Sequence, residues 1–313
     1  MCETQQTDMD RLLKIDDLSV RFRMYGTNLE QRELEVISNL TLDVFPGEIV
    51  AVAGSSGSGK SLLAHAVMGL LPPNASATGT VLYKGRPLNP ARQEALRGRE
   101  IALIPQSVSF LDPLMNTGMQ VMGKEKRAEE QKRIFSRLGL AQETAKLYPF
   151  QLSGGMARRI LAATAIISGA TLILADEPTP GMDPAIALEA LQCFRELADS
   201  GKSIVLITHD IDIAMGIADR LAVFYAGTTL EVAPAENFTA GLEALRHPYT
   251  KALWNALPQN GFKAIPGFQP YAGELPSGCL FAPRCSAASP ECEARTPPMR
   301  ELRGGTVRCI HAA

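Results

Sequence analysis

The chain has 313 residues, of which 46% are hydrophobic and 20% are charged, enough to bury one large core and leave material for a small appendage. Its 31 basic and 33 acidic residues give a formal net charge of -2, so no overall field favours nucleic acid. Apolar runs such as 49–53 and 171–175 are far shorter than the roughly 20 residues that cross a bilayer. The polar, acidic start over residues 1–5 lacks the features of a signal peptide. We therefore expect a cytosolic chain whose membrane role, if it has one, depends on a partner.

Two strand patterns follow one another along the chain. From about residue 12 to residue 44 apolar and polar residues alternate, which predicts antiparallel strands at the edge of the core. Apolar, β-rich runs then recur at 49–53, 101–104, 171–175 and 203–207, with helix-favouring stretches between them. This order predicts an α/β core with a largely parallel sheet.

Composition also suggests where the chain divides. The stretch from Met119 to Pro149 is charged and helix-favouring, with a run at 124–133 typical of a solvated helix face, and we expect a helical subdomain at about 107–168. After about Arg246 prolines and glycines multiply and periodicity fades. We therefore expect one domain over 1–245 and a C-terminal extension over 246–313.

A glycine-rich loop carries the clearest chemical signal. Residues 54–61 fit G-x-x-x-x-G-K-[ST], follow a strand-like run and precede the helix-like stretch 62–68. Such a loop cradles phosphates with backbone N–H groups, and Lys60 is expected to reach the β and γ phosphates while Ser61 ligates Mg²⁺. A chance glycine turn is disfavoured by the flanking strand and helix. The expected ATP-binding residues are Gly54, Ser55, Ser56, Gly57, Ser58, Gly59, Lys60 and Ser61.

Two carboxylates end a later strand-like run. Asp176 and Glu177 follow the apolar residues 171–175, at the edge where an α/β sheet presents its ligands. Asp176 is expected to hold Mg²⁺ directly or through water, and Glu177 to polarise the attacking water as general base. Alone, such an ending is as often structural as functional. Together with the glycine loop it indicates nucleotide hydrolysis.

The segment Leu-Ser-Gly-Gly-Met at 152–156 resembles the signature of ATP-binding cassette (ABC) ATPases, and it lies between the glycine loop and the carboxylates as in that family. The resemblance implies the P-loop nucleotide-binding fold of that family, an α/β fold with an antiparallel β edge subdomain and a helical subdomain. It also implies that Ser153, Gly154 and Gly155 serve the ATP held by the other cassette of a dimer. Because a helical stretch follows, their N–H groups are suited to meet phosphate.

Other family elements occur in the expected order. By resemblance, Gln106 touches Mg²⁺ and senses the membrane subunit, Asp183 belongs to a dimer-contact loop, and His209 is a switch that contacts the γ-phosphate. A lone histidine is more often structural, but His209 follows a predicted strand directly. Phe22 lies where the family usually stacks an aromatic ring on adenine, although Tyr25 is nearby and an alternating strand also supplies core phenylalanines.

Two residues depart from the family pattern. The text after the carboxylates is Pro-Thr-Pro-Gly-Met-Asp, so Pro180 and Gly181 stand where the family usually has Thr-Ala, and we expect a stiffened, reshaped dimer contact. Ala157 stands where peptide-importer relatives commonly carry arginine. Neither change removes a group that hydrolysis requires.

The end of the chain resembles one branch of the family. Segments 247–253, 278–285 and 307–309 are similar to the C-terminal region of bacterial peptide and nickel importer ATPases. Residues 147–150 and the short helical insert look more like the nickel and metal-chelate members. In that branch an external binding protein and the membrane subunits select the solute, so this sequence leaves the choice between nickel, metal chelate and peptide open.

Four cysteines, spaced C-x5-C-x6-C-x16-C, gather in the extension: Cys279, Cys285, Cys292 and Cys309. Disulfides are disfavoured in a reducing cytosol, and clustered cysteines there more often bind metal or take part in redox chemistry. Related importer subunits carry a [4Fe–4S] cluster at this pattern, so an iron–sulfur cluster is the preferred expectation, with zinc and free thiols as alternatives. We expect its role to be structural, in a tail separate from the phosphate site.

Taken together, the motifs predict the ATP-hydrolysing subunit of an importer on the cytoplasmic face of the bacterial inner membrane. The resemblance implies two membrane permeases, a second and non-identical ATP-binding subunit, and an extracytoplasmic binding protein. The rival hypothesis is a soluble ABC ATPase with a regulatory or nucleic-acid role. Such proteins usually carry two cassettes or a long coiled coil, whereas this chain has one glycine loop and no sustained heptads.

Overall fold

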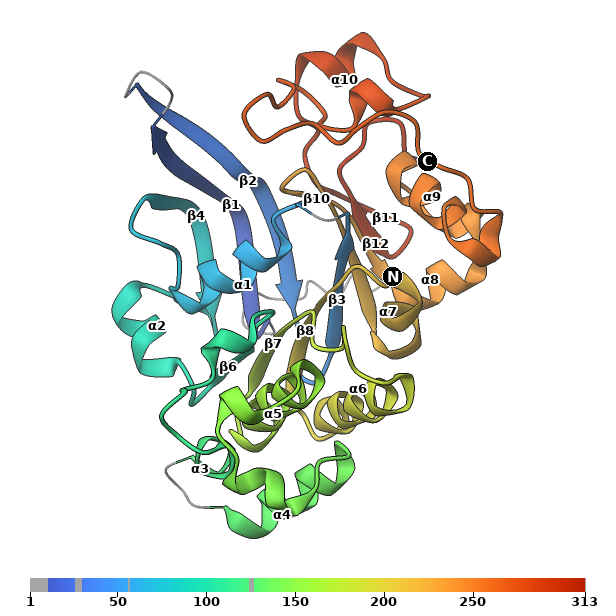
Figure 1. Ribbon diagram of the computed structural model, residues 1–313. Coiled ribbons are helices and arrows are strands. Elements are labelled where there is room, and N and C mark those ends of the chain that lie inside the picture. Colours follow the sequence, from blue (N-terminus) through green and yellow to red (C-terminus); the bar gives the residue numbers. More distant parts are fainter. Residues whose placement is uncertain (1–10, 26–29, 56, 124–126, 313) are drawn as a thin grey trace. The chain divides into compact units, whose positions relative to one another are not determined.

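Figure 1 presents the computed structural model, which describes residues 11–25, 30–55, 57–123 and 127–312. The chain forms two compact units. The first comprises Met1–Phe45, Val50–Leu88 and His209–Ala313, and the second Pro46–Ile49 and Asn89–Thr208. The stretch 107–168, predicted to form a helical subdomain, lies within the second unit.

An antiparallel sheet forms the N-terminal part of the first unit. Its strands are β1 (Leu13–Tyr25), β2 (Gln31–Val44), β4 (Ala75–Tyr83) and β5 (Arg86–Pro87), in the order β2-β1-β4-β5. β1 pairs antiparallel with both β2 and β4. Buried Leu13, Ile15, Leu18 and Val20 alternate with more exposed residues over part of β1. The antiparallel strands predicted from the alternation at 12–44 are confirmed.

A second group of strands in the first unit carries the glycine loop. In the order β11-β12-β10-β9-β3, these are β11 (Arg300–Leu302), β12 (Gly305–Val307), β10 (Thr228–Pro234), β9 (Arg220–Tyr225) and β3 (Ile49–Gly54). β3 and β9 are parallel, whereas β10 pairs antiparallel with β9 and β12. The C-terminal extension therefore contributes two strands beside β10, drawn in dark red in Figure 1.

The helices of the first unit are short. They are α1 (Lys60–Met68), α7 (Ile211–Ile217), α8 (Ala235–Ala240), α9 (Pro248–Asn255) and α10 (Pro290–Ala294), with 3₁₀ turns η5 (Leu242–Ala244), η6 (Pro258–Asn260) and η7 (Ala282–Arg284). The extension shares the core of this unit: Leu280 and Phe281 pack in one cluster with Val223, Tyr225 and Tyr249. A short, proline-rich tail is in this way stabilised by the larger core rather than by one of its own.

The second unit holds three parallel strands, β6 (Ile101–Ile104), β7 (Leu172–Asp176) and β8 (Ser203–Thr208), in the order β8-β7-β6. β7 and β8 are buried along their whole length, which explains their continuous apolar sequences. The helical elements are α2 (Pro90–Leu96), α3 (Thr117–Met122), α4 (Ala128–Arg137), α5 (Gly154–Ile167) and α6 (Pro184–Asp199), with 3₁₀ turns η2 (Val108–Phe110), η3 (Gln142–Lys146) and η4 (Pro149–Gln151). The predicted α/β core with parallel strands is confirmed.

Among the described residues, every helix is either too short or too polar to span a membrane.

Candidate nucleotide-binding site

The glycine loop leaves β3 at Gly54, where two strands come close together. A Cβ atom at Gly54 would lie 2.3 Å from the carbonyl oxygen of Phe224 on β9, so only glycine fits. Gly57 and Gly59 have φ angles of 76° and 86°, in the left-handed region that other residues rarely adopt. Gly59 then caps the start of α1. The glycine positions of the predicted motif therefore have local backbone reasons.

The charged group of the loop is held against its own backbone. Lys60 is 6% exposed, and its Nζ donates hydrogen bonds to the carbonyl oxygens of Gly54 at 2.8 Å and Ser55 at 2.9 Å. Ser58 is buried, and its carbonyl accepts from the Gly227 N–H at 3.1 Å. Ser61 follows Lys60 in the first turn of α1. Ser56 lies outside the described residues.

The two carboxylates lie at the end of β7. Asp176 is 1% exposed and is the last residue of the strand. Glu177 has a φ of 46°, an uncommon conformation for a residue with a side chain and one that clusters at functional sites. Its N–H donates to the Ile207 carbonyl at 2.9 Å, and its carbonyl accepts from Arg158 Nη1 at 3.2 Å. These two hydrogen bonds hold the Glu177 backbone in this strained conformation and so fix the position of its Cα atom.

Two more predicted residues follow parallel strands. Gln106 is exposed and lies two residues beyond β6, while His209 is exposed and comes directly after β8. The carboxyl ends of β6 and β8 lie at the same edge of the sheet as Asp176, because the three strands are parallel. Gln106 belongs to the second compact unit, whereas His209 is the first residue of a segment of the first unit.

The signature segment starts a helix, as predicted. Ser153 is the N-cap of α5, and its Oγ accepts from the Met156 N–H at 3.3 Å. Gly155 lies against the loop predicted to make the dimer contact, since a Cβ atom there would be 2.8 Å from the Gly181 carbonyl oxygen. Gly154 has open space around it. The signature and the contact loop are therefore neighbours within the second unit.

Asp183 also has a local structural role. Its Oδ1 accepts from the Ala185 N–H at 2.9 Å and caps α6. Before it, Gly181 takes a φ of 75° and Met182 N–H closes a turn on Thr179. The unusual Pro180-Gly181 pair is thus part of a regular turn that leaves Asp183 at the start of a helix.

The other departure, Ala157, is 4% exposed on the buried side of α5. A small side chain suits that position.

Phe22 is half-buried on β1, opposite Leu34 of β2 and Ala75 of β4. Tyr25, at the end of the same strand, is 69% exposed. Which of the two rings stacks on adenine stays a prediction.

Sequence reasoning missed two residues that contact the glycine loop. The Ser55 hydroxyl donates to Gln269 Oε1, from the proline- and glycine-rich part of the extension. Buried Tyr249 also interacts with Ser55: burial raises the pKa of its phenol, and hydrogen bonding to Ser55 partly offsets the rise. The expectation that the tail lies apart from the phosphate site is therefore wrong. Gln269 has no sequence signal, whereas Tyr249 belongs to the motif at 247–253.

The four tail cysteines are present as thiols. Cys279, Cys292 and Cys309 are buried and Cys285 is half-buried. Burial raises the pKa of Cys279, Cys285 and Cys309, and neighbouring thiols add to the rise. Within the described part of the chain, no three His, Cys, Asp or Glu side chains are placed to hold a metal ion. The expected iron–sulfur or zinc ligand set is therefore not formed in this arrangement.

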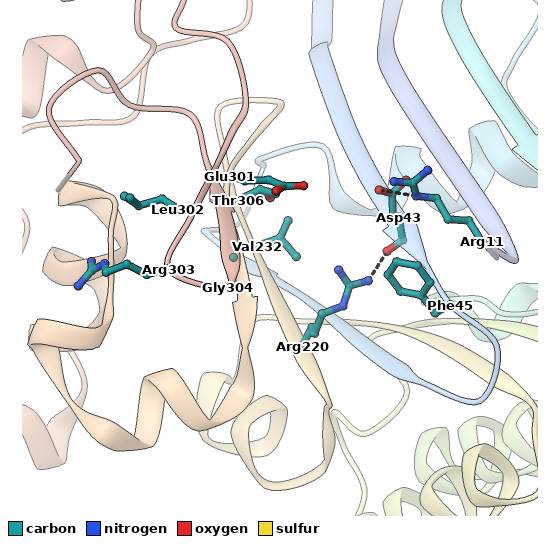
Figure 2. Close-up of a pocket in the computed structure, with 11 residues that line it drawn as sticks. Arg11, Asp43, Phe45, Arg220, Val232, Glu301, Leu302, Arg303, Gly304 and Thr306 are labelled. Atoms are coloured by element: carbon teal, nitrogen blue, oxygen red, sulfur yellow. Dashed lines mark hydrogen bonds and ion pairs between the residues drawn. The ribbon is translucent and has the colours of Figure 1, made fainter. Parts of the chain in front are cut away.

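A cavity of about 440 Å³ lies elsewhere in the first unit (Figure 2). Arg11 Nε is 3.0 Å from Asp43 Oδ2, and Arg220 donates to the Asp43 carbonyl at 2.6 Å while its guanidinium lies 4.9 Å from the centre of the Phe45 ring. Burial raises the pKa of the Asp43 carboxyl, and the two arginines counteract this. None of the predicted ATP-site residues that the structure describes lines the cavity.

A glycine loop between a buried strand and a helix, an Asp-Glu strand end and a Ser-Gly-Gly helix start define a P-loop ATPase with a cassette signature. Residues 37–180 match the ABC transporter family, and residues 230–292 match the oligopeptide/dipeptide transporter C-terminal region. The chain belongs to the ABC transporter family. It is an ATPase in which hydrolysis is coupled to transport.

Individual relatives match along most of their length. The dipeptide transport ATP-binding protein DppD of Bacillus subtilis is 33% identical, over 96% of this chain and 95% of the relative. The oligopeptide transport ATP-binding protein OppD of Escherichia coli is also 33% identical, over 97% and 94%. Among solved structures, a dimeric post-hydrolysis ATP-binding cassette bound to ADP and Pi matches with a TM-score of 0.63 and 25% identity, covering 71% of this chain and 98% of that one.

Proposed function

We propose that this chain is the ATP-hydrolysing subunit that powers peptide import through a membrane ABC transporter. The observation that carries the proposal is the similarity to dipeptide and oligopeptide transport ATP-binding proteins over nearly the whole chain, including the C-terminal region. The rival, a soluble ABC ATPase with a regulatory or nucleic-acid role, has no comparable support. A net charge of -2 also disfavours a nucleic-acid partner.

Peptide is the proposed solute in place of nickel or a metal chelate. The preference for nickel rested on residues 147–150 and the short helical insert. A dipeptide and an oligopeptide transport ATP-binding protein from different bacteria instead match across nearly the whole chain, and a match of that length outweighs a four-residue resemblance.

In the proposed mechanism each residue acts by position and charge. Lys60 faces the β and γ phosphates, and the backbone N–H groups of the loop bind the same oxygens. Glu177 accepts a proton from the attacking water, which His209 helps to orient near the γ-phosphate. The N–H groups at the start of α5, beside Ser153, bind the ATP of the other cassette, so that two ATP molecules draw two cassettes together.

Magnesium has suitable oxygen ligands in this proposal. The Ser61 hydroxyl, the Gln106 amide oxygen and the Asp176 carboxylate are hard oxygen donors of the kind that Mg²⁺ prefers, and Asp176 is buried at a strand end. When bound, Mg²⁺ neutralises the charge that develops on the phosphates.

The partners and location follow from the same family. We propose two membrane permeases, a second and non-identical cassette, and an extracytoplasmic peptide-binding protein, with this chain on the cytoplasmic face of the inner membrane. We propose residues 1–245 as the cassette and residues 246–313 as the extension. Within the cassette, we propose that Asp183 takes part in the dimer contact and that Phe22 stacks on the adenine.

We also keep the tail cysteines as a candidate metal site. Cys292 is among the neighbouring groups that add to the raised pKa of Cys279, Cys285 and Cys309, which supports a shared role. Binding a [4Fe–4S] cluster or zinc requires their side chains to turn toward one centre. Anaerobically purified protein is expected to contain iron and sulfide, and Cys285→Ala to lose them while Cys193→Ala keeps them. Zinc without iron would support a zinc site in place of the cluster. The absence of both metals would contradict the metal site.

The solute proposal is tested with the assembled transporter and its binding protein. ATP hydrolysis is expected to rise when the binding protein carries a di- or oligopeptide and to stay at its basal rate with a nickel chelate. The Lys60→Ala chain is the control that separates this ATPase from contaminants. Stimulation by the nickel chelate alone would overturn the peptide proposal.

A further inference from the structure

Two different parts of the first unit contact the phosphate loop. Gly54 packs against the Phe224 backbone, and the Ser58 carbonyl accepts a hydrogen bond from the Gly227 N–H. Both the start and the end of the loop are therefore in contact with the segment around β9. Gly57 has nothing within 4 Å of its Cβ position. Ser55, two residues before Gly57, is instead held by the C-terminal region through a hydrogen bond to Gln269.

Tyr249 is itself fixed by a buried network. It is 2% exposed, and its N–H donates to Nδ1 of the helix cap His247 at 2.9 Å. Its ring lies 4.6 Å from that of Tyr225 and 5.3 Å from that of Phe281. Phe281 belongs to the extension, two residues after Cys279. The Tyr249 ring is therefore held from two sides by packing.

The segment that carries Gln269 is tied down by Arg284. The guanidinium donates to the Pro266 carbonyl at 2.7 Å and to the Ile265 carbonyl at 3.0 Å. It also donates to the Tyr225 hydroxyl at 3.2 Å. One arginine therefore joins the segment before Gln269 to the aromatic cluster that positions Tyr249.

We infer that the C-terminal region positions the phosphate loop, with Gln269 as a positioning residue that acts through Ser55. This inference rests on the proposed role of residues 54–61 in binding ATP. The physical reason is preorganisation: a loop whose first half is already fixed loses less conformational freedom when it closes around phosphates. Gln269 contacts the loop and is expected to affect the binding of MgATP more than the chemical step.

The test is MgATP binding to the full chain, measured by calorimetry, in a double-mutant cycle. Gln269→Ala and Ser55→Ala are each expected to raise Kd by about 3- to 10-fold, the effect of one lost hydrogen bond. The double variant is expected to match Ser55→Ala, because that change already removes the contact with Gln269. Gln259→Ala is the matched control, since this tail glutamine bonds to Asp212 instead. It is expected to leave Kd unchanged.

A second readout separates positioning from a merely structural role. In the assembled transporter Gln269→Ala is expected to raise KM for ATP by the same factor while kcat at saturating ATP stays within about twofold, the pattern of lost binding.

Lys60→Ala distinguishes failure of the inference from failure of the proposed function. If Lys60→Ala weakens binding and Gln269→Ala does not, the positioning role is overturned and the phosphate loop stands. If Lys60→Ala has no effect either, the phosphate-loop assignment fails. If the double variant instead raises Kd by the product of the two single-variant factors, the two residues act independently and the inference is overturned.

Discussion

Arg246 and Glu231 form an ion pair in which neither side chain is exposed, with Arg246 Nη1 3.2 Å from Glu231 Oε1. The carboxylate also accepts from the backbone N–H groups of Arg246 at 3.1 Å and His247 at 2.8 Å. The guanidinium in turn donates to the Leu302 carbonyl at 2.6 Å. The pair therefore ties β10 both to the segment before α9 and to the β11–β12 hairpin of the extension.

Removing one member of this pair is expected to be costly. Glu231→Ala leaves a buried guanidinium without its counter-ion and is expected to lower the free energy of unfolding by about 3 kcal/mol or more, measured by chemical denaturation. The matched control is Glu291→Ala, which breaks an exposed pair with Arg295 and is expected to cost less than about 1 kcal/mol. Equal losses in the two variants would contradict a stabilising role for the buried pair.

His247 predicts a dependence of stability on pH. Burial lowers the pKa of its ring to about 3, below the usual 6.5, so the unfolded chain takes up a proton in this range and the folded chain does not. The contribution of His247 to the free energy of unfolding is fully present above about pH 6.5. Below that pH it falls by up to about 1.4 kcal/mol per pH unit. Protonation at Nδ1 also removes the acceptor of the Tyr249 N–H.

The variant His247→Asn isolates this effect, because asparagine can still cap α9 but does not titrate. Between pH 6.5 and pH 5 its free energy of unfolding is expected to fall less steeply than that of the original chain. Identical slopes would show that His247 does not titrate differently in the folded and unfolded states.

Glu177→Gln tests the chemical step. ATP binding is expected to be nearly unchanged, while turnover falls by at least about a hundredfold, the scale of a lost general base. Exposed Glu143 supplies the control, and Glu143→Gln is expected to be neutral. Turnover must be measured in the assembled transporter with the partner cassette disabled, so that the second site does not carry the flux. Near-normal hydrolysis there would rule out Glu177 as the base.

The contact between the signature and its neighbouring loop gives a steric prediction. Gly155→Ala places a Cβ atom 2.8 Å from the Gly181 carbonyl, so the backbone has to shift. We expect a loss of stability of about 1–3 kcal/mol and reduced ATPase activity. Gly216→Ala in α7 meets nothing within 4 Å and is expected to be neutral or slightly stabilising. Thermal melts of the two variants provide the comparison.

Much of the fold was predictable because its signals are local. The alternation along β1 and β2 and the apolar runs of β6, β7 and β8 follow from which faces are buried. The glycine loop was predictable for the same reason: Gly57 and Gly59 adopt left-handed backbone angles that the motif itself implies. Helix caps at Ser153 and Asp183 also agree with their sequence context.

Contacts between distant segments were not predictable. Ser55 and Gln269 are 214 residues apart, and nothing in the sequence around Gln269 indicates that it meets the phosphate loop. The extension was expected to be a separate module because its prolines and cysteines contrast with the core. Its β12 strand in fact pairs with β10, since a segment too short for its own core gains stability by extending an existing sheet.

Because ATP hydrolysis by this chain is proposed to drive peptide uptake, the uptake of peptide is the quantity to measure. The transporter is assembled in lipid vesicles with this chain, its permeases, its partner cassette and a peptide-loaded binding protein, and labelled peptide is followed across the bilayer. We predict accumulation that requires ATP and falls to background when this chain carries Glu177→Gln. Uptake that proceeds without ATP, or that is unchanged by Glu177→Gln, would contradict this role of the chain.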